Sequence, residues 1–419
     1  MPEQLQETHG HKQDSRVGPR PLALHMATQT MMWTSLLAAL PSLRNGSLSW
    51  SPDLQNAARG LEKKLEGVEP EDFAAAIDAE ARRRLMCFAD GVIAYRDNKR
   101  IPRPPEPDCV WQQGSTRLLD YGTIDGADKN GIGVLFVPSL INRSYILDLS
   151  EKRSLLRDLS KRGFRPLLVD WGEPGEEELK ADLNDTICGP LDAAFTAARN
   201  LTDGKIAVVG YCMGGLLALA LAKRRIEDVS SLVMLATPWD FYAYDPGKTR
   251  MLKAMVPNIE HLIDTVGFLP VDVLQAMFAS FDPNMTPRKF RTFAALNGNS
   301  ARARDFVALE DWLNDGVHLA GPTARNCLID WYVDNLPDKG EWIMDGEPVR
   351  PEDIHVPTLV VIPKRDYIVP PESSAPLLRL LPDVTEMEID GGHIGMMVGS
   401  KAKGGLYTPL AKWLEKNIV

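Results

Sequence analysis

The chain has 419 residues, of which 44% are hydrophobic and 25% are charged. This length suits one large α/β domain with appendages, or two domains. Asp and Glu outnumber Lys and Arg by 57 to 47, which gives a formal net charge of -10 and argues against a nucleic-acid partner. The five cysteines are an odd number, and no two have metal-ligand spacing. They favour a reducing cytoplasm over a disulfide framework, and we expect no metal site.

The first hundred residues predict a tail, helices and a linker. Residues 1–20 are polar and lack the layout of a signal peptide, so we expect a disordered tail. Residues 21–108 predict a helical N-terminal region that ends in the Pro-rich linker IPRPPEPD, at 101–108. The apolar stretch 26–43 is broken by Thr, Gln and Ser, which predicts a helix and not a membrane span. Such a helix either packs in a core or rests on an apolar surface.

From residue 109 to residue 419 the pattern alternates between strands and helices. Short apolar runs predict buried strands at 131–140, 165–172, 205–211, 231–238 and 356–363, and VTEMEI predicts a further strand at 384–389. Amphipathic segments between them, such as 154–164 and 184–201, predict helices. The repeated β–α units predict an α/β fold with a mostly parallel sheet covered on both faces. Between about 240 and 350 the periodicity is helical without strands, which predicts a helical cap inserted after a strand of the sheet.

The sequence VVGYCMGG, at 208–215, has the form of a nucleophile elbow with a cysteine where a serine is usual. Gly210, Gly214 and Gly215 flank Cys212, as expected where a tight turn strains the nucleophile and tolerates only small neighbours. A cysteine at a helix N-terminus lies where the dipole favours a thiolate. The alternative is a buried cysteine in an ordinary βα turn.

Two further residues complete a predicted catalytic triad. Asp366 follows one apolar strand and His393 follows another, and in this order an acid and a base suit an elbow nucleophile. Both lie at carboxyl ends of strands, where sites form in open α/β sheets. Asp390 is a rival acid, although it also reads as a turn residue before two glycines. Asp366 and His393 themselves have structural alternatives, a solvated loop carboxylate and a core histidine.

The predicted oxyanion hole uses two backbone N–H groups. One belongs to Met213, which follows the nucleophile, and the other to Leu140 or Ile141 in the loop after an early strand. A separate histidine, His318, falls inside the predicted cap. It is either structural or part of the lining of an entrance.

The chain resembles the polyhydroxyalkanoate synthase family from about residue 110 to its C-terminus. The blocks that carry the resemblance are VPSLINRSYILDLSEKRSLLRDLSKRGFRPLLVDWGEP, GYCMGG, LATPWDF, WLNDGVHLAGPTARNCLIDWYVDNL, IPKRDYIVPPESS and GGHIGMMVGSKAKGG, in the family's order. This resemblance implies an α/β-hydrolase fold with a helical cap and a helical N-terminal arm. The family's triad falls on Cys212, Asp366 and His393.

The resemblance also implies a reaction and its partners. A 3-hydroxyacyl-CoA is polymerised into polyester through an acyl-cysteine, with release of CoA and without a metal or organic cofactor. The chain length is closer to the two-subunit type, whereas the arm at 21–100 is longer than that type carries, so a second synthase subunit and a homodimer both stay open. The expected location is the cytoplasm, at the surface of polymer granules. A thioesterase or lactone hydrolase, and a non-catalytic granule-associated protein, are the alternatives.

Overall fold

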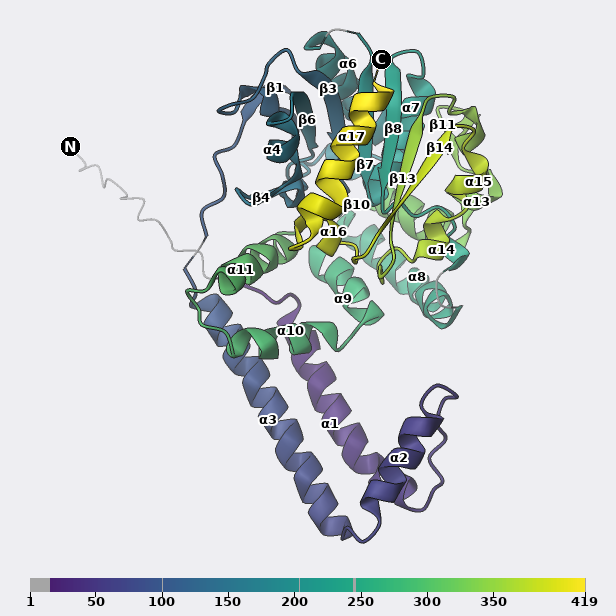
Figure 1. Ribbon diagram of the computed structural model, residues 1–419. Coiled ribbons are helices and arrows are strands. Elements are labelled where there is room, and N and C mark those ends of the chain that lie inside the picture. Colours follow the sequence, from purple (N-terminus) through teal and green to yellow (C-terminus); the bar gives the residue numbers. More distant parts are fainter. Residues whose placement is uncertain (1–15, 100, 203, 244–245, 419) are drawn as a thin grey trace, which may run out of the picture. The chain divides into compact units, whose positions relative to one another are not determined.

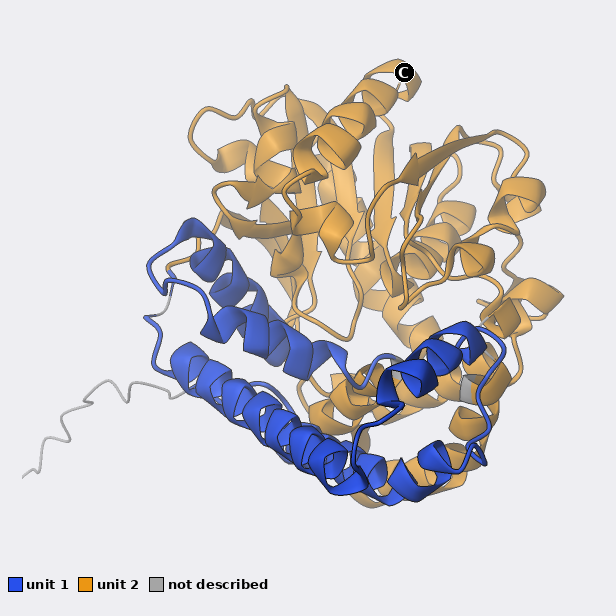
Figure 2. Cartoon of the chain, turned by 60° about the horizontal axis from the view of Figure 1, so that its bottom comes forward, with its two compact units in different colours: residues 1–101, 282–314 blue, residues 102–281, 315–419 orange. Residues whose placement is uncertain are grey.

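The computed structural model describes residues 16–99, 101–202, 204–243 and 246–418. The chain divides into two compact units, drawn in two colours in Figure 2. Unit 1 comprises residues 1–101 and 282–314, and unit 2 comprises residues 102–281 and 315–419. The first boundary falls in the Pro-rich linker. The second unit therefore begins where the sequence changes from helical periodicity to alternating strands and helices.

Unit 2 is built on an eight-stranded sheet in the order β1-β2-β6-β3-β7-β8-β13-β14 (Figure 1). The strands are β1 (Asp108–Gln113), β2 (Thr116–Asp120), β3 (Ile132–Val137), β6 (Phe164–Asp170), β7 (Ile206–Tyr211), β8 (Val229–Leu235), β13 (Thr358–Pro363) and β14 (Val384–Ile389). All neighbouring pairs from β6 to β14 are parallel, and only the β1–β2 and β2–β6 pairs are antiparallel. The predicted α/β fold with a mostly parallel sheet is confirmed.

Helices cover both faces of this sheet (Figure 1). The principal ones are α4 (Leu155–Ser160), α6 (Asp192–Asn200), α7 (Met213–Arg224) and α17 (Thr408–Asn417). α4 packs on β6 and α17 on β8, whereas α6 packs on β2 and β3, and α7 packs on β7 and β8. The first ten residues of α7 are all buried, because an uncharged Leu/Ala helix is stable only inside a core.

The strand order places a topological switch at the centre of the sheet. From β3 the chain crosses to β6 on one side, and then returns to β7 on the other side of β3. Loops that leave β3 and β7 therefore diverge at the carboxyl edge of the sheet. Crevices of this kind are where ligands bind in open α/β folds.

The segment predicted as a strand-free cap contains short strands. β9 (Phe268–Leu269) pairs with β10 (Leu319–Ala320), and β11 (Ile343–Met344) pairs with β12 (Glu347–Pro348). The expectation of helices without strands was wrong here, since two-residue strands leave no periodicity in a sequence. The remaining elements of unit 2 are β4 (Asp148–Ser150), β5 (Arg153–Ser154), α5 (Leu183–Thr186), α8 (Pro246–Val266), α9 (Val271–Phe281), α12 (Gly321–Arg325), α13 (Leu336–Lys339), α14 (Pro371–Ser374), α15 (Leu377–Leu380), α16 (Gly395–Val398), π-helices Ile187–Leu191, Asn326–Val333 and Lys403–Tyr407, and several 3-10 turns.

Unit 1 is helical and combines two distant parts of the chain. Its helices are α1 (Leu22–Arg44), α2 (Gln55–Leu65), α3 (Pro70–Arg96), α10 (Met285–Ala294) and α11 (Ala301–Asn314). α10 packs on α3 through edge-to-face contacts of Phe290 with Phe88 (6.1 Å between ring centroids) and with Tyr95 (5.6 Å). Residues 282–314, inside the predicted cap, thus share a core with the N-terminal helices.

Charged residues reinforce this small core. Lys289 pairs with Glu310 at 2.6 Å, and burial raises the pKa of the Glu310 carboxyl. Residues 1–15 of the predicted disordered tail lie outside the described residues. Arg16, which the same prediction included, is buried; it pairs with Asp311 at 2.7 Å and donates to the Tyr95 carbonyl at 3.1 Å.

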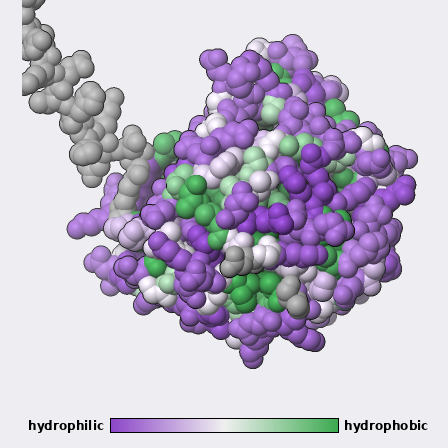
Figure 3. All heavy atoms as spheres, turned by 90° about the horizontal axis from the view of Figure 1, so that it is seen from above, coloured by the Kyte–Doolittle hydropathy of each residue, from purple (hydrophilic) through white to green (hydrophobic). Residues whose placement is uncertain are grey.

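Exposed apolar side chains differ from one part of the surface to another. Figure 3 shows a face covered mostly by hydrophilic side chains, with hydrophobic residues in small separate groups. Helix α1 of unit 1 is an exception, because Met31 and Leu36 are 66% and 53% exposed. Among the helices of the described ranges, none is long and apolar enough to cross a membrane.

Candidate active site

Cys212 lies in the sharp turn between β7 and α7. Its φ of 56° and ψ of −127° belong to a region that non-glycine residues rarely adopt, as in a nucleophile elbow. The Cys212 N–H donates to the Leu235 carbonyl of the neighbouring strand at 2.9 Å, which anchors the turn. A Cβ on Gly210 would meet the backbone of Gly214, and one on Gly214 would meet the Val137 carbonyl. The glycines around the half-buried cysteine are therefore required by close backbone packing.

Asp366 and His393 meet from two adjacent strand ends. The His393 Nδ1–H donates to Asp366 Oδ2 at 2.6 Å, and both side chains are buried. The other carboxylate oxygen, Oδ1, accepts the N–H groups of Ile368 and Val369 at 2.8 and 2.9 Å. The acid is thus held by its own loop, and it fixes the imidazole so that Nε2 is left for another partner.

That partner is Cys212. Burial disfavours the charged imidazole, but the charge of Cys212 and hydrogen bonds to Asp366 and Cys212 outweigh it and raise the pKa of His393 to about 10. Asp366 is therefore hydrogen-bonded to His393, and the charge of Cys212 acts on the same imidazole in this chain of three residues. An imidazolium is favoured in this chain whenever the sulfur carries negative charge.

Tyr211 contacts His393 through both its ring and its hydroxyl. Its ring stacks on the His393 imidazole with 5.1 Å between centroids and 29° between planes. Its hydroxyl donates to the His393 backbone carbonyl at 3.2 Å. Burial, followed by the charges of Cys212 and Asp366, raises the pKa of Tyr211 well above its usual value, so the phenol stays neutral. Sequence reasoning missed this residue, since no pattern distinguishes a buried Tyr at a strand end from an ordinary core residue.

The candidate oxyanion donors differ in whether their N–H groups already make a hydrogen bond. Met213 is the first residue of α7, where helical N–H groups have no partner in the helix. The N–H of Ile141 already donates to Ser139 Oγ at 3.2 Å. Within the part of the chain that is described, the Leu140 N–H makes no hydrogen bond. Leu140 is therefore better suited than Ile141 to pair with Met213.

The rival acid lies elsewhere. The Asp390 side chain is 65% exposed and pairs with Arg365 at 3.0 Å and with Lys401 at 3.4 Å. No group of three or more His, Cys, Asp or Glu side chains in the described ranges is arranged to hold a metal ion. The geometry thus offers a cysteine, a histidine and a buried carboxylate, which together suit acyl transfer through a thioester.

Comparison with known proteins identifies the fold and the family of the chain. The family model of the α/β hydrolase fold matches residues 134–400. A poly(3-hydroxyalkanoate) polymerase subunit PhaC from Allochromatium vinosum is 31% identical over 74% of this chain and 88% of its own length. The chain belongs to the poly(3-hydroxyalkanoate) polymerase family. Polymerase subunits from Synechocystis sp. (32% identical, 68% of this chain and 78% of the relative) and Haloarcula marismortui (30% identical, 78% and 71%) are also similar.

The α/β hydrolase match spans most of unit 2 together with residues 282–314 of unit 1. The matched α/β hydrolase segment includes the strands that carry Cys212, Asp366 and His393. It begins in β3, after helices α1 to α3 have ended. The polymerase fold is thus shown for the part of the chain that contains the candidate active site.

Proposed function

We propose that this chain polymerises 3-hydroxyacyl groups from CoA thioesters into a polyester, as an acyltransferase with Cys212 as its nucleophile. The observation that carries the proposal is the chain of contacts from Asp366 through His393 to Cys212, in a member of the polymerase family. The names of the relatives supply the product class. The geometry supplies the residues.

The first half-reaction loads the enzyme. His393 Nε2 takes the proton of the Cys212 thiol, and the thiolate attacks the thioester carbonyl carbon. The N–H groups of Met213 and Leu140 stabilise the oxyanion that forms. When the intermediate collapses, the carbon–sulfur bond to CoA breaks and CoA takes the proton from His393. One thioester replaces another, so the acyl group stays activated.

The second half-reaction forms the ester. His393 takes the proton from the hydroxyl of a second 3-hydroxyacyl unit or chain end, and that oxygen attacks the acyl-Cys212 carbonyl. The new C–O bond forms as the C–S bond breaks, and the cysteine sulfur recovers a proton from His393. Asp366 keeps the imidazole in one tautomer and stabilises its cation through both steps.

The proposal includes partners and a location. The substrate is a 3-hydroxyacyl-CoA, and no metal or organic cofactor takes part. A second synthase subunit or a second copy of this chain completes the assembly, in the cytoplasm. Helix α1 is the part proposed to touch the polymer, because it has no charged residue before Arg44 and exposes Met31, Met32 and Leu36.

Product analysis tests the proposal. Purified protein is given 3-hydroxybutyryl-CoA, released CoA is measured, and products are separated into polymer and free acid. Polymer that disappears in Cys212→Ala supports the proposal. Free 3-hydroxybutyrate identifies a thioesterase or lactone hydrolase instead. Absence of acyl-Cys212 by mass spectrometry, with several acyl chains and with an added partner subunit, leaves the non-catalytic granule protein.

A further inference from the structure

A cavity of about 440 Å³ opens in unit 2 beside the loop that carries Leu140. Ligand pockets in proteins are commonly about 300–1,000 Å³, so the cavity is large enough for a small molecule. Its wall is mainly apolar and is formed by Leu140, Trp171, Pro174, Pro190, Leu319 and Ala320. We call it the apolar cavity. The triad does not line it.

The apolar cavity adjoins the elbow. Leu140 follows β3 and Trp171 follows β6, and β3 lies directly between β6 and β7, the strand that ends at Cys212. The Trp171 Nε1–H donates to the Pro138 carbonyl at 3.1 Å, which joins the two loops. Ser139 Oγ lies 3.9 Å from the sulfur of Met213, the residue after the nucleophile. The loop that lines the cavity at Leu140 therefore contacts the first turn of α7 through Ser139.

The charge of the lining is negative. Glu177, Glu178 and Asp185 contribute to it, and no Lys or Arg does so among the described lining residues. The Glu178 carboxylate accepts the N–H groups of Ser115 (2.8 Å) and Gly175 (3.0 Å), and the hydrogen bond to Ser115 is the main reason that its pKa is lowered. Glu178 thus stays ionised, and phosphate groups such as those of CoA are repelled. A neutral ester chain is not.

His318 adds a fixed part of the wall. Its Nδ1 accepts the Val271 N–H at 3.3 Å. The ring packs against Phe268 with 4.4 Å between centroids. His318 lines the apolar cavity.

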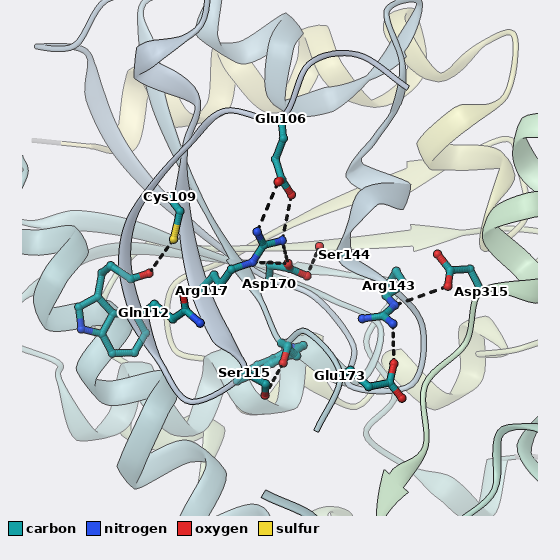
Figure 4. A network of polar contacts seen from close by, with 12 residues as sticks. Glu106, Cys109, Gln112, Ser115, Arg117, Arg143, Ser144, Asp170, Glu173 and Asp315 are labelled. Carbon is teal, nitrogen blue, oxygen red and sulfur yellow. Dashed lines mark hydrogen bonds and ion pairs between the residues drawn. The ribbon is translucent and has the colours of Figure 1, made fainter. Parts of the chain in front are cut away.

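A second cavity nearby is lined by charged side chains of both signs. It has a volume of about 220 Å³, and Arg103, Arg117 and Arg143 are among its lining residues. Figure 4 shows that Arg117 is neutralised by Glu106 and Asp170, while Arg143 contacts Glu173 and Asp315. These arginines are engaged by carboxylates, which leaves little charge for an anionic ligand.

The Arg143 contacts instead hold the rim of the apolar cavity. Glu173 (2.5 Å from Arg143) precedes Pro174, and Asp315 (3.7 Å) precedes the segment that contains Val317. Val317 in turn donates its N–H to the Ile141 carbonyl at 3.4 Å. Three separate segments of the chain are thus fastened around the cavity.

We propose that the apolar cavity is the acyl subsite: it holds the polyester units that adjoin the hydroxyacyl group on Cys212, and it rejects the CoA moiety. The inference rests on the proposed polymerase function and specifies where its neutral product lies. The acidic side chains of the lining repel the phosphate groups of the CoA half of the substrate. They do not repel the acyl half, because that half is uncharged.

Gly189 offers a way to fill the cavity. It lines the cavity within the π-helix Ile187–Leu191, and a Cβ added to it meets nothing within 4 Å. Gly189→Phe therefore places a ring in open space. Gly404→Phe is the matched control, since Gly404 also lies in a π-helix, Lys403–Tyr407, has equal space for a Cβ and does not line the cavity.

The first measurement is calorimetric binding of a neutral probe, the methyl ester of a 3-hydroxybutyrate trimer, to the Cys212→Ala protein. We expect Gly189→Phe in this background to weaken binding at least tenfold, whereas Gly404→Phe binds like the parent. An equimolar amount of CoA should not displace the trimer. Equal trimer affinity in all three proteins, or displacement by CoA, overturns the acyl subsite.

Turnover separates this inference from the function on which it rests. In the Cys212-containing protein, Gly189→Phe should form acyl-Cys212 from 3-hydroxybutyryl-CoA but elongate it at least tenfold more slowly than Gly404→Phe. Normal elongation by Gly189→Phe overturns the subsite while leaving the polymerase intact. If no variant makes polymer but trimer binding still depends on Gly189, the polymerase proposal fails and the neutral-ester site stands.

Discussion

Unit 1 and unit 2 use buried charge for different purposes. In unit 2 the buried Asp366 and His393 face a reactive cysteine and lie at the edge of a large aliphatic core around the sheet. In unit 1 the buried Glu310 and Arg16 join helices around a core of seven residues. Unit 2 thus holds the candidate triad beside structural ion pairs such as Arg165 with Asp120 (2.6 Å), whereas the buried pairs of unit 1 join its segments. Substitutions should affect turnover in the one and stability in the other.

The largest effect is expected at Asp366. Asp366→Asn should fold with nearly unchanged thermal stability, because its oxygen still accepts the N–H groups of Ile368 and Val369. Its amide NH₂ no longer accepts the His393 Nδ1–H, so the wrong tautomer is favoured and turnover falls about 10³–10⁴-fold. CoA release and thermal denaturation measure the two quantities. An unimpaired turnover would remove Asp366 from the proposed triad.

At Phe290 we expect a loss of stability rather than a loss of turnover. This side chain is fully buried between Phe88 and Tyr95, and Phe290→Ala should lower the free energy of unfolding of unit 1 by about 3–5 kcal/mol. Chemical denaturation followed by circular dichroism should then show an early transition for the helices of unit 1. The exposed Arg82→Gln variant is the control, as its pair with Asp78 contributes about 0–1 kcal/mol. A single unshifted transition would contradict the aromatic core as the basis of unit 1.

A smaller effect on chemistry is expected at Tyr211. The groups that face His393 are Cys212, Asp366 and the Tyr211 ring, and the ring stabilises an imidazolium stacked on it by about 0.5–2 kcal/mol. Tyr211→Leu should therefore move the alkaline limb of the pH–turnover profile, set by a His393 pKa of about 10, downward by about one pH unit.

Tyr211→Phe separates stacking from hydrogen bonding. It keeps the ring and loses only the bond from the hydroxyl to the His393 carbonyl. We expect its alkaline limb to coincide with that of the parent, with a modest loss of stability. A limb that moves equally in the Phe and Leu variants would show that the hydroxyl, and not the ring, supports the histidine.

The smallest effect is a pH dependence of unit 1. Burial, the largest influence, holds the pKa of His25 below its usual 6.5. The unfolded chain then binds a proton more readily than the folded one, so the contribution of His25 to stability is lost as pH falls through about 6.5. Denaturation of His25→Gln at pH 7.5 and pH 5.5 should show a weaker pH dependence than the parent. An unchanged dependence would assign the effect to other groups.

The sequence was most informative where structure is repetitive and buried. Strand β13 spans Thr358–Pro363, within the predicted range 356–363, because a buried apolar run between turn residues has few alternatives. The β1–β2 hairpin was not predicted, since β1 (DCVWQQ) is exposed and shows no alternation. The division of the predicted cap between the two units was also not predicted from the sequence. It depends on contacts between Phe290 and residues about 200 positions away, which no local pattern encodes.

The site shows the same limit. Cys212 could be identified from its flanking glycines. Close backbone packing requires glycine at these positions, so the requirement is visible in the sequence. Asp366 and Asp390 both follow strand ends, and only the hydrogen bond to His393 distinguishes them. Leu140 and Ile141 differ only in whether the N–H is already occupied. Choices between neighbouring residues depend on orientation, which side-chain type alone does not specify.

The discontinuity of unit 1 has a consequence for synthesis on the ribosome. Helices α1 and α3 emerge early, but their partner α10 follows only after the 180 residues from Pro102 to Phe281. At about 5–20 residues per second, this interval lasts roughly 10–40 s. During that time Phe88 and Tyr95 lack the ring they pack against, beside the apolar surface of α1. The nascent chain should therefore depend on chaperones most strongly before residue 314 has left the exit tunnel.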